Sequence, residues 1–236
     1  MKAVQGQQLA FGVIPSYRKY ELFMARYVGM MEYIRPLAEA KKGEEKLELL
    51  DLGSGGGYLH YFGQGLPIAW TGVEFKPERR QACSELGYSM YATNLEIEPL
   101  PFGDNAFDVV VASHVFEHLE NLDGALKEAW RVLKPGGLMI VGVPMHVGVA
   151  GLLMTAVYRI RGEKIGGHCR FFTMRSLKKL FQGKEIIDIR GFRLISARKR
   201  FGWEDHYFFY RANTIWGRLL PSLTPEVNVV VRKEIN

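Results

Sequence analysis

The stretch that most constrains the fold of this chain is Asp51-Leu52-Gly53-Ser54-Gly55-Gly56-Gly57. An apolar run from Lys46 to Leu50 precedes it and has the length of a buried strand. The segment after it, Tyr58 to Phe62, is typical of a first helical turn. Glycine allows a ligand to approach the backbone, and a helix N-terminus offers unpaired N–H groups. A strand, an acid, a glycine turn and a helix therefore predict a ligand site in an α/β domain.

The spacing of the glycines separates the candidate ligands. A dinucleotide site needs G-x-G-x-x-G, but Tyr58 stands where the third glycine would fall. A phosphate-binding P-loop ends in Gly-Lys-Ser/Thr, and no lysine follows these glycines closely. The spacing that fits is D-x-G-x-G-x-G, which resembles motif I of the class I S-adenosylmethionine-dependent methyltransferases. A glycine-rich connection that binds nothing is the alternative at this point.

Four further segments follow in the order and spacing of that family. Glu74 closes an apolar strand, and residues 99–108 read PLPFGDNAFD. Ser113 to Leu119 reads SHVFEHL, and Leu133 to Gly137 reads LKPGG. Together these segments cover about residues 47–144 and resemble the type 11 methyltransferases. Each segment alone is a weak signal, whereas the ordered set is specific.

This resemblance implies an α/β fold with a doubly wound, mostly parallel seven-stranded sheet and helices on both faces. The implied strand order is 3-2-1-4-5-7-6, with the last strand antiparallel. Apolar runs predict the strands at 46–50, 68–73, 88–92, 108–112, 138–143, 191–197 and 227–231. The first helix is predicted to begin after Ser16 and to be interrupted at Pro36.

The length of 236 residues suits one domain. Its predicted parts are an N-terminal helical cap at 1–45, a cofactor-binding core at 46–144, variable acceptor-side segments at 145–223 and the final strand at 224–236.

The cofactor implied by the resemblance is S-adenosylmethionine. In the family, the residue matching Asp51 holds the amino-acid end of the cofactor, and the one matching Glu74 accepts hydrogen bonds from the ribose hydroxyls. Phe75 is expected to pack on the adenine, and Asn94 stands where the family has an aspartate that accepts from the adenine amine. The full predicted set is Asp51, Gly53, Ser54, Gly55, Gly57, Glu74, Phe75, Asn94, Leu95, Ser113 and His114.

Methyl transfer requires alignment of an acceptor and exclusion of water, so we expect neither a metal site nor a covalent nucleophile. A weakly acidic acceptor would need a general base, and imidazole has a suitable pKa. The candidate bases are His114, His118, His146 and His168. The Glu117-His118 pair has a second interpretation, which is that it only braces its loop.

Composition bears on partners and location. The net charge is +6, and the two cysteines, Cys83 and Cys169, form no CxxC pair. No apolar run approaches the roughly 20 residues that span a bilayer. With no signal peptide in the sequence, we expect a cytoplasmic protein. Residues 147–164 and 206–220 combine apolar residues with arginines. One interpretation is that both segments pack on the core or form a dimer contact, and the other is peripheral contact with a membrane surface.

Nucleic acid is not an expected partner. Enzymes that methylate adenine in nucleic acid carry Asn/Asp-Pro-Pro-Tyr/Phe after the fourth strand, where this chain reads Ala112-Ser113-His114-Val115. The predicted function is methyl transfer to a small-molecule, glycan-linked or lipid-linked acceptor, with oxygen as the expected atom. The alternative is a protein of this fold that binds the cofactor without turnover and acts as a scaffold. Acceptor and oligomeric state stay open.

Overall fold

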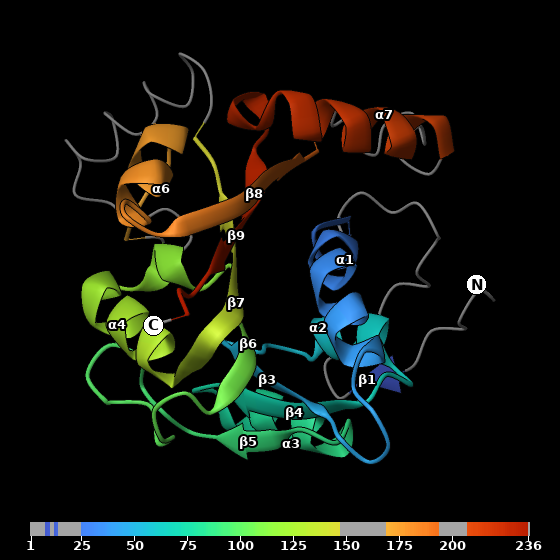
Figure 1. Cartoon of the computed structure of the whole chain (residues 1–236), viewed down its shortest axis with the longest axis vertical. Helices are drawn as coiled ribbons and strands as arrows, with labels where there is room; N and C mark the ends of the chain where they lie inside the picture. The colour runs from blue at the N-terminus through green and yellow to red at the C-terminus, as the bar shows by residue number, and fades with distance from the viewer. Residues whose placement is uncertain (1–7, 10–11, 14–24, 147–168, 194–206, 236) are drawn as a thin grey trace.

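The computed structural model describes residues 8–9, 12–13, 25–146, 169–193 and 207–235, and its centre is a seven-stranded sheet (Figure 1). Across the sheet the strands are β5 (Ser89–Tyr91), β4 (Ile68–Val73), β3 (Leu47–Leu52), β6 (Phe107–Ser113), β7 (Leu133–Pro144), β9 (Glu226–Arg232) and β8 (Glu185–Phe192). The first five are parallel to one another, and β9 is antiparallel to both of its neighbours. In chain order this is 3-2-1-4-5-7-6, so the predicted fold class and topology are confirmed.

Helices cover both faces of the sheet (Figure 1). One face carries α1 (Ala25–Glu39), α2 (Tyr58–Gly63) and α3 (Pro77–Glu85). The other carries α4 (Leu122–Val132) and α6 (Met174–Leu180). The remaining elements are α7 (Tyr207–Leu219), which packs on β8, the 3-10 turns η2 (Phe116–His118) and η4 (Pro221–Leu223), and the short antiparallel pair β1 (Gln8–Leu9) and β2 (Gly12–Val13). Within the ranges described, no helix is both long and apolar enough to cross a membrane.

The central strands are apolar throughout because both of their faces are buried. Alternate residues of a strand point to opposite faces. Val109 and Val111 therefore pack with Ile34 of α1, while Val110 and Ala112 pack on the α4 side. All four valine and alanine side chains are fully buried, which fixes the register of β6 between the two helical layers.

The predicted strand at 191–197 was wrong, because β8 ends at Phe192 where that strand was expected to begin. Residues 194–197 lie outside the described residues. β8 forms an edge of the sheet and alternates apolar with charged residues. Its charges have partners on α1: Tyr33 donates to Asp188, and Arg190 Nη1 lies 2.6 Å from Glu32 Oε2. A search for apolar runs did not find this strand, because it contains charged residues whose partners come from α1.

The predicted interruption at Pro36 was also wrong, since α1 continues to Glu39. Proline removes only its own N–H, and Pro36 lies in the last turn, where its carbonyl accepts from the Ala40 N–H at 3.1 Å. The predicted N-cap Ser16 lies outside the part of the chain that the structure describes, as does the segment 147–164.

Candidate functional site

Two adjoining pockets lie at the carboxyl ends of β3, β4 and β6. The first has a volume of about 280 Å³ and the second about 330 Å³, and both are lined by Gly53, Arg79 and His114. Ligand sites of doubly wound sheets occupy this edge, because the loops after neighbouring strands converge there. Every residue of the predicted cofactor set lines one of these pockets, with the exception of Gly57.

The glycine turn forms one wall of the first pocket. Gly53, Gly55 and Gly57 have φ values of 61°, 57° and 72°, a region that side chains disfavour. A Cβ on Gly53 would lie 2.5 Å from Val115 Cγ2, and one on Gly57 would lie 2.5 Å from Leu86 Cδ1. Gly55 instead has no side chain within contact range of its Cβ position. Gly57 thus allows close packing of the turn on α3, whereas Gly55 leaves its backbone open to a ligand.

Asp51 lies near the end of β3 and lines the first pocket, although only 4% of its surface is exposed. The Tyr88 hydroxyl donates to Asp51 Oδ2 at 3.1 Å. Burial raises the pKa of the Asp51 carboxyl to about 7, against the Tyr88 hydrogen bond and with a contribution from the charge of Glu74. In the described part of the chain no lysine or arginine forms an ion pair with Asp51, so this buried acid is suited to receive a cation from a ligand.

Glu74 follows β4 and lines the second pocket. Its Oε2 accepts from the Gly55 N–H at 3.1 Å, and its Oε1 accepts from the Lys76 N–H at 3.0 Å. Arg79 Nη1 lies 3.6 Å from Oε2. These contacts hold the carboxylate between the glycine turn and the start of α3, next to both pockets.

Three residues that line the second pocket differ in exposure, packing and hydrogen bonding. Phe75 is 68% exposed, so its ring is available to a planar ligand. Leu95 packs against the apolar core at the same pocket. Asn94 Oδ1 accepts from the Glu96 N–H at 3.0 Å, so the amide oxygen expected to meet adenine also closes its own turn.

His114 stands where the two pockets join and has a positive φ of 56°. Its Nδ1 lies 3.2 Å from Glu117 Oε1, and its Nε2 lies 3.2 Å from Glu226 Oε1. Arg26 Nη1 donates to the same Glu226 oxygen at 2.7 Å. Burial and the nearby Arg26 lower the pKa of His114, but the two carboxylates outweigh them and the net shift is upward. Arg26 Nη1 also lies 3.1 Å from Nε2, so the ring is enclosed by two carboxylates and one guanidinium.

The other candidate bases are placed differently. The His118 side chain is 42% exposed and lines the second pocket. His146 contacts Phe171 with the two rings tilted and their centroids 4.3 Å apart, and it lines neither pocket. His168 lies outside the described residues. Across the described ranges, no group of three or more His, Cys, Asp or Glu side chains is arranged to hold a metal ion.

Sequence reasoning left further residues out of the predicted site, and the most informative ones carry charge or an aromatic ring. Tyr27 and Arg79 line the first pocket, and Arg26 and Glu226 hold His114. Arg79 follows Glu74 by five residues, so its place on the first turns of the next helix was a usable signal. Arg26, Tyr27 and Glu226 come from α1 and β9, and no local pattern assigns them to this edge of the sheet.

Residues 50–141 match a family model described as a methyltransferase domain. The chain is 32% identical over 119 residues to an uncharacterized methyltransferase of Mycolicibacterium vanbaalenii, a region covering 49% of this chain and 47% of that protein. It is 32% identical over 111 residues to a sterol 4-C-methyltransferase of Caenorhabditis elegans, covering 44% and 33%. The matched region thus spans less than half the length of these relatives.

Among solved structures, the fold resembles a SAM-dependent methyltransferase from Archaeoglobus fulgidus. The TM-score is 0.58 and the sequence identity 16%, over 91% of this chain and 95% of the other.

Proposed function

Because the core of this chain belongs to the methyltransferase-domain family, we propose that the protein binds S-adenosylmethionine and transfers its methyl group to a small-molecule, glycan-linked or lipid-linked acceptor. The observation that carries the proposal is the pair of nearly buried carboxylates, Asp51 and Glu74. They stand at the ends of neighbouring parallel strands and line two adjoining pockets.

The residues present fit the chemistry of that cofactor. Asp51 would hold the ammonium group, because its carboxylate is buried and lines the first pocket. Glu74 would accept from the ribose hydroxyls, and the exposed ring of Phe75 with Leu95 would contact the adenine. When bound, the cofactor supplies a methyl group activated by a positively charged sulfur.

His114 is proposed to orient the acceptor at the first pocket. Its Nδ1 and Nε2 each lie 3.2 Å from a carboxylate oxygen, of Glu117 and Glu226, and Arg26 Nη1 lies 3.1 Å from Nε2, so the ring is held in place where the two pockets join. We propose an oxygen acceptor that is more acidic than an alcohol, such as a phenol or an enol, because such an acceptor lowers the demand on a general base. Alignment and water exclusion would then supply the rate enhancement.

The acceptor class draws support from one relative. The Caenorhabditis elegans protein is named a sterol 4-C-methyltransferase, so a similar core in that protein serves a large apolar acceptor. An apolar acceptor for the present chain is consistent with that similarity.

Calorimetry with S-adenosylmethionine tests the cofactor assignment. Glu74→Ala removes hydrogen bonds to charged oxygen worth about 1.5–3 kcal/mol each, so we expect affinity to fall by roughly tenfold to a hundredfold. The matched control is Glu78→Ala, which removes an exposed carboxylate from the first turn of α3 and should leave affinity unchanged. Equal affinities of the two variants would remove Glu74 from the site.

Turnover is measured separately, as release of S-adenosylhomocysteine in the presence of phenolic, glycan and lipid acceptor pools. Release with one pool, lost in Asp51→Asn, supports the enzyme. Tight cofactor binding without release from any pool would favour the scaffold alternative.

A further inference from the structure

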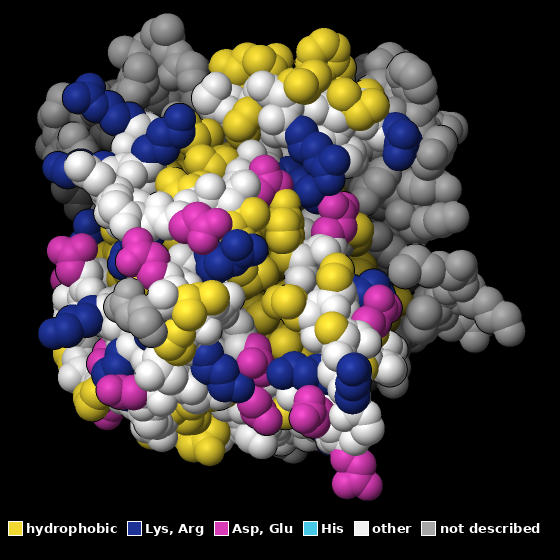
Figure 2. All heavy atoms as spheres, in the orientation of Figure 1, with side chains coloured by type: hydrophobic (Ala, Val, Ile, Leu, Met, Phe, Trp, Pro, Cys, Tyr) yellow, Lys and Arg dark blue, Asp and Glu magenta, His cyan; other side chains and the backbone are white. Residues whose placement is uncertain are grey.

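The outer side of α7 and the turn after it form an exposed apolar ridge, defined here as Ile215, Trp216, Leu219, Leu220 and Leu223. Their exposed fractions are 49%, 45%, 65%, 38% and 53%. Figure 2 shows hydrophobic side chains gathered along the edge of the molecule over α7. Large apolar residues exposed together, and not singly, usually mark a contact surface.

The ridge projects outward because the opposite side of α7 is committed to β8. Asn213 and Gly217 are buried on that side. A Cβ on Gly217 would lie 2.0 Å from the Gly191 carbonyl oxygen, so helix and strand are in backbone contact. At about 100° per residue, Ile215 and Leu219 then point away from the sheet.

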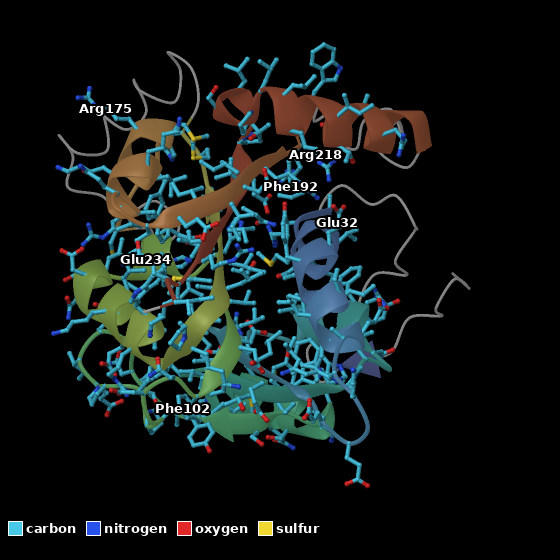
Figure 3. The ribbon with its side chains drawn as sticks, viewed as in Figure 1. Glu32, Phe102, Arg175, Phe192, Arg218 and Glu234 are labelled. Atoms are coloured by element: carbon cyan, nitrogen blue, oxygen red, sulfur yellow. The ribbon has the colours of Figure 1, made fainter. Side chains whose placement is uncertain are left out.

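Basic residues flank the ridge. Arg211 and Arg218 are seven residues apart and therefore lie on the same side of α7, and the helix sequence contains no acidic residue. Arg218 is 53% exposed and pairs with Glu32 of α1 at 3.1 Å, beneath the helix in Figure 3. An apolar ridge that includes a tryptophan and has arginines along one side is typical of a helix lying in a membrane interface.

We propose that the α7 ridge docks this protein onto an anionic lipid bilayer, with α7 parallel to the surface. The inference deepens the proposed function, on which it rests, by naming where a lipid-linked acceptor would be met. A bilayer accommodates a convex ridge, whereas a protein partner needs a matching groove.

Co-sedimentation with vesicles tests the proposal. The probes are vesicles of phosphatidylcholine with phosphatidylglycerol, and vesicles of phosphatidylcholine alone. We expect the full chain to bind the anionic vesicles, and Ile215→Ser with Leu219→Ser to reduce that binding at least tenfold. The matched control is Ile97→Ser with Ile235→Ser, which removes two side chains that are 80% and 82% exposed elsewhere. The control should bind as the unmodified protein does.

Three outcomes would overturn the proposal: no binding to anionic vesicles, equal binding by ridge and control variants, or a dimer in light scattering that the ridge variant dissociates. Cofactor affinity, measured by calorimetry on the same variants, keeps the two proposals apart. Vesicle binding without cofactor binding contradicts the proposed function alone, and cofactor binding without vesicle binding contradicts the ridge alone.

Discussion

At the scale of a single residue, the proposed contact between Asp51 and the cofactor predicts that binding depends on pH. Its pKa is raised to about 7 by burial, and the cofactor's ammonium group requires the carboxylate form. Below pH 7 binding must displace a proton, so we expect affinity to fall as pH decreases from 7.5 to 5.5, approaching tenfold per pH unit. Calorimetry across this range measures the effect, and Asp51→Asn should give weak binding with a flat profile.

Tyr88→Phe is the companion variant for that profile. The Tyr88 hydrogen bond stabilises the Asp51 carboxylate, so its removal should move the midpoint of the pH dependence upward. The other titratable groups near Asp51 are Glu74, Tyr27 and Cys83. An unchanged midpoint with intact folding would show that Tyr88 only fills space.

The free energy of unfolding of the free protein should depend on pH in the opposite sense from cofactor affinity, because of Asp51. The folded-state pKa is raised from 3.8 to about 7, so the folded state favours the protonated form. The stability that protonation contributes is complete below about pH 4 and is lost as pH rises through 7. Asp51→Asn should therefore raise the free energy of unfolding at pH 8, on the order of 2–4 kcal/mol. Urea denaturation at pH 8 and pH 4 provides the measurement, and a stabilisation of equal size at both pH values would contradict the assignment.

At the scale of elements, the parallel core could be predicted because its signals are local. β4 was predicted with its observed bounds, since an apolar run sits between Pro67 and an acid. β8 could not be predicted, because Asp188 and Arg190 acquire their partners only when α1 packs beside the strand. The interruption predicted at Pro36 failed for a related reason, as packing of α1 on the sheet outweighs one missing hydrogen bond.

The docking of α7 on β8 gives a prediction at the same scale. Alanine normally stabilises a helix interior by about 1 kcal/mol over glycine. At Gly217 a methyl group would overlap the Gly191 carbonyl, which cannot move without breaking the end of β8, so the clash dominates. We expect Gly217→Ala to lower the free energy of unfolding by about 1–3 kcal/mol.

Urea denaturation measures this change, and Gly103→Ala, at an exposed position with nothing near its Cβ, is the control. A variant at 217 as stable as the control would mean that α7 is not held against β8 as described.

Considered as a whole molecule, the site joins parts of the chain with very different predictability. Asp51 and Glu74 were found from spacing, because each follows its own strand and the parallel order brings the strand ends together. Arg26 and Glu226 are 200 residues apart in sequence and meet only after the complete sheet has formed. No periodicity or motif records such a contact, so the way in which α1 and β9 hold His114 beside the pockets could not be predicted.

Ligand binding should therefore slow amide hydrogen exchange outside the cofactor motif as well. Tyr27 of α1 lines the first pocket beside the glycine turn, so S-adenosylhomocysteine should slow amide hydrogen exchange in α1 and α2, about tenfold or more at saturation. α6 lines neither pocket and should exchange at an unchanged rate. Protection confined to residues 50–141 would mean that α1 takes no part in binding.

The Arg26–Glu226 contact also has a consequence for synthesis of the chain. Arg26 leaves the ribosome 200 residues before the carboxylate that neutralises it, and β9 must insert between β7 and β8 before the two can meet. Until then α1 lacks its ion pair with β9, although the glycine turn, Asp51 and Glu74 have already been synthesised. The cofactor motif is thus synthesised before the contact that holds the start of α1. While the 200 residues between Arg26 and Glu226 are made, a nascent chain carries α1 without this contact.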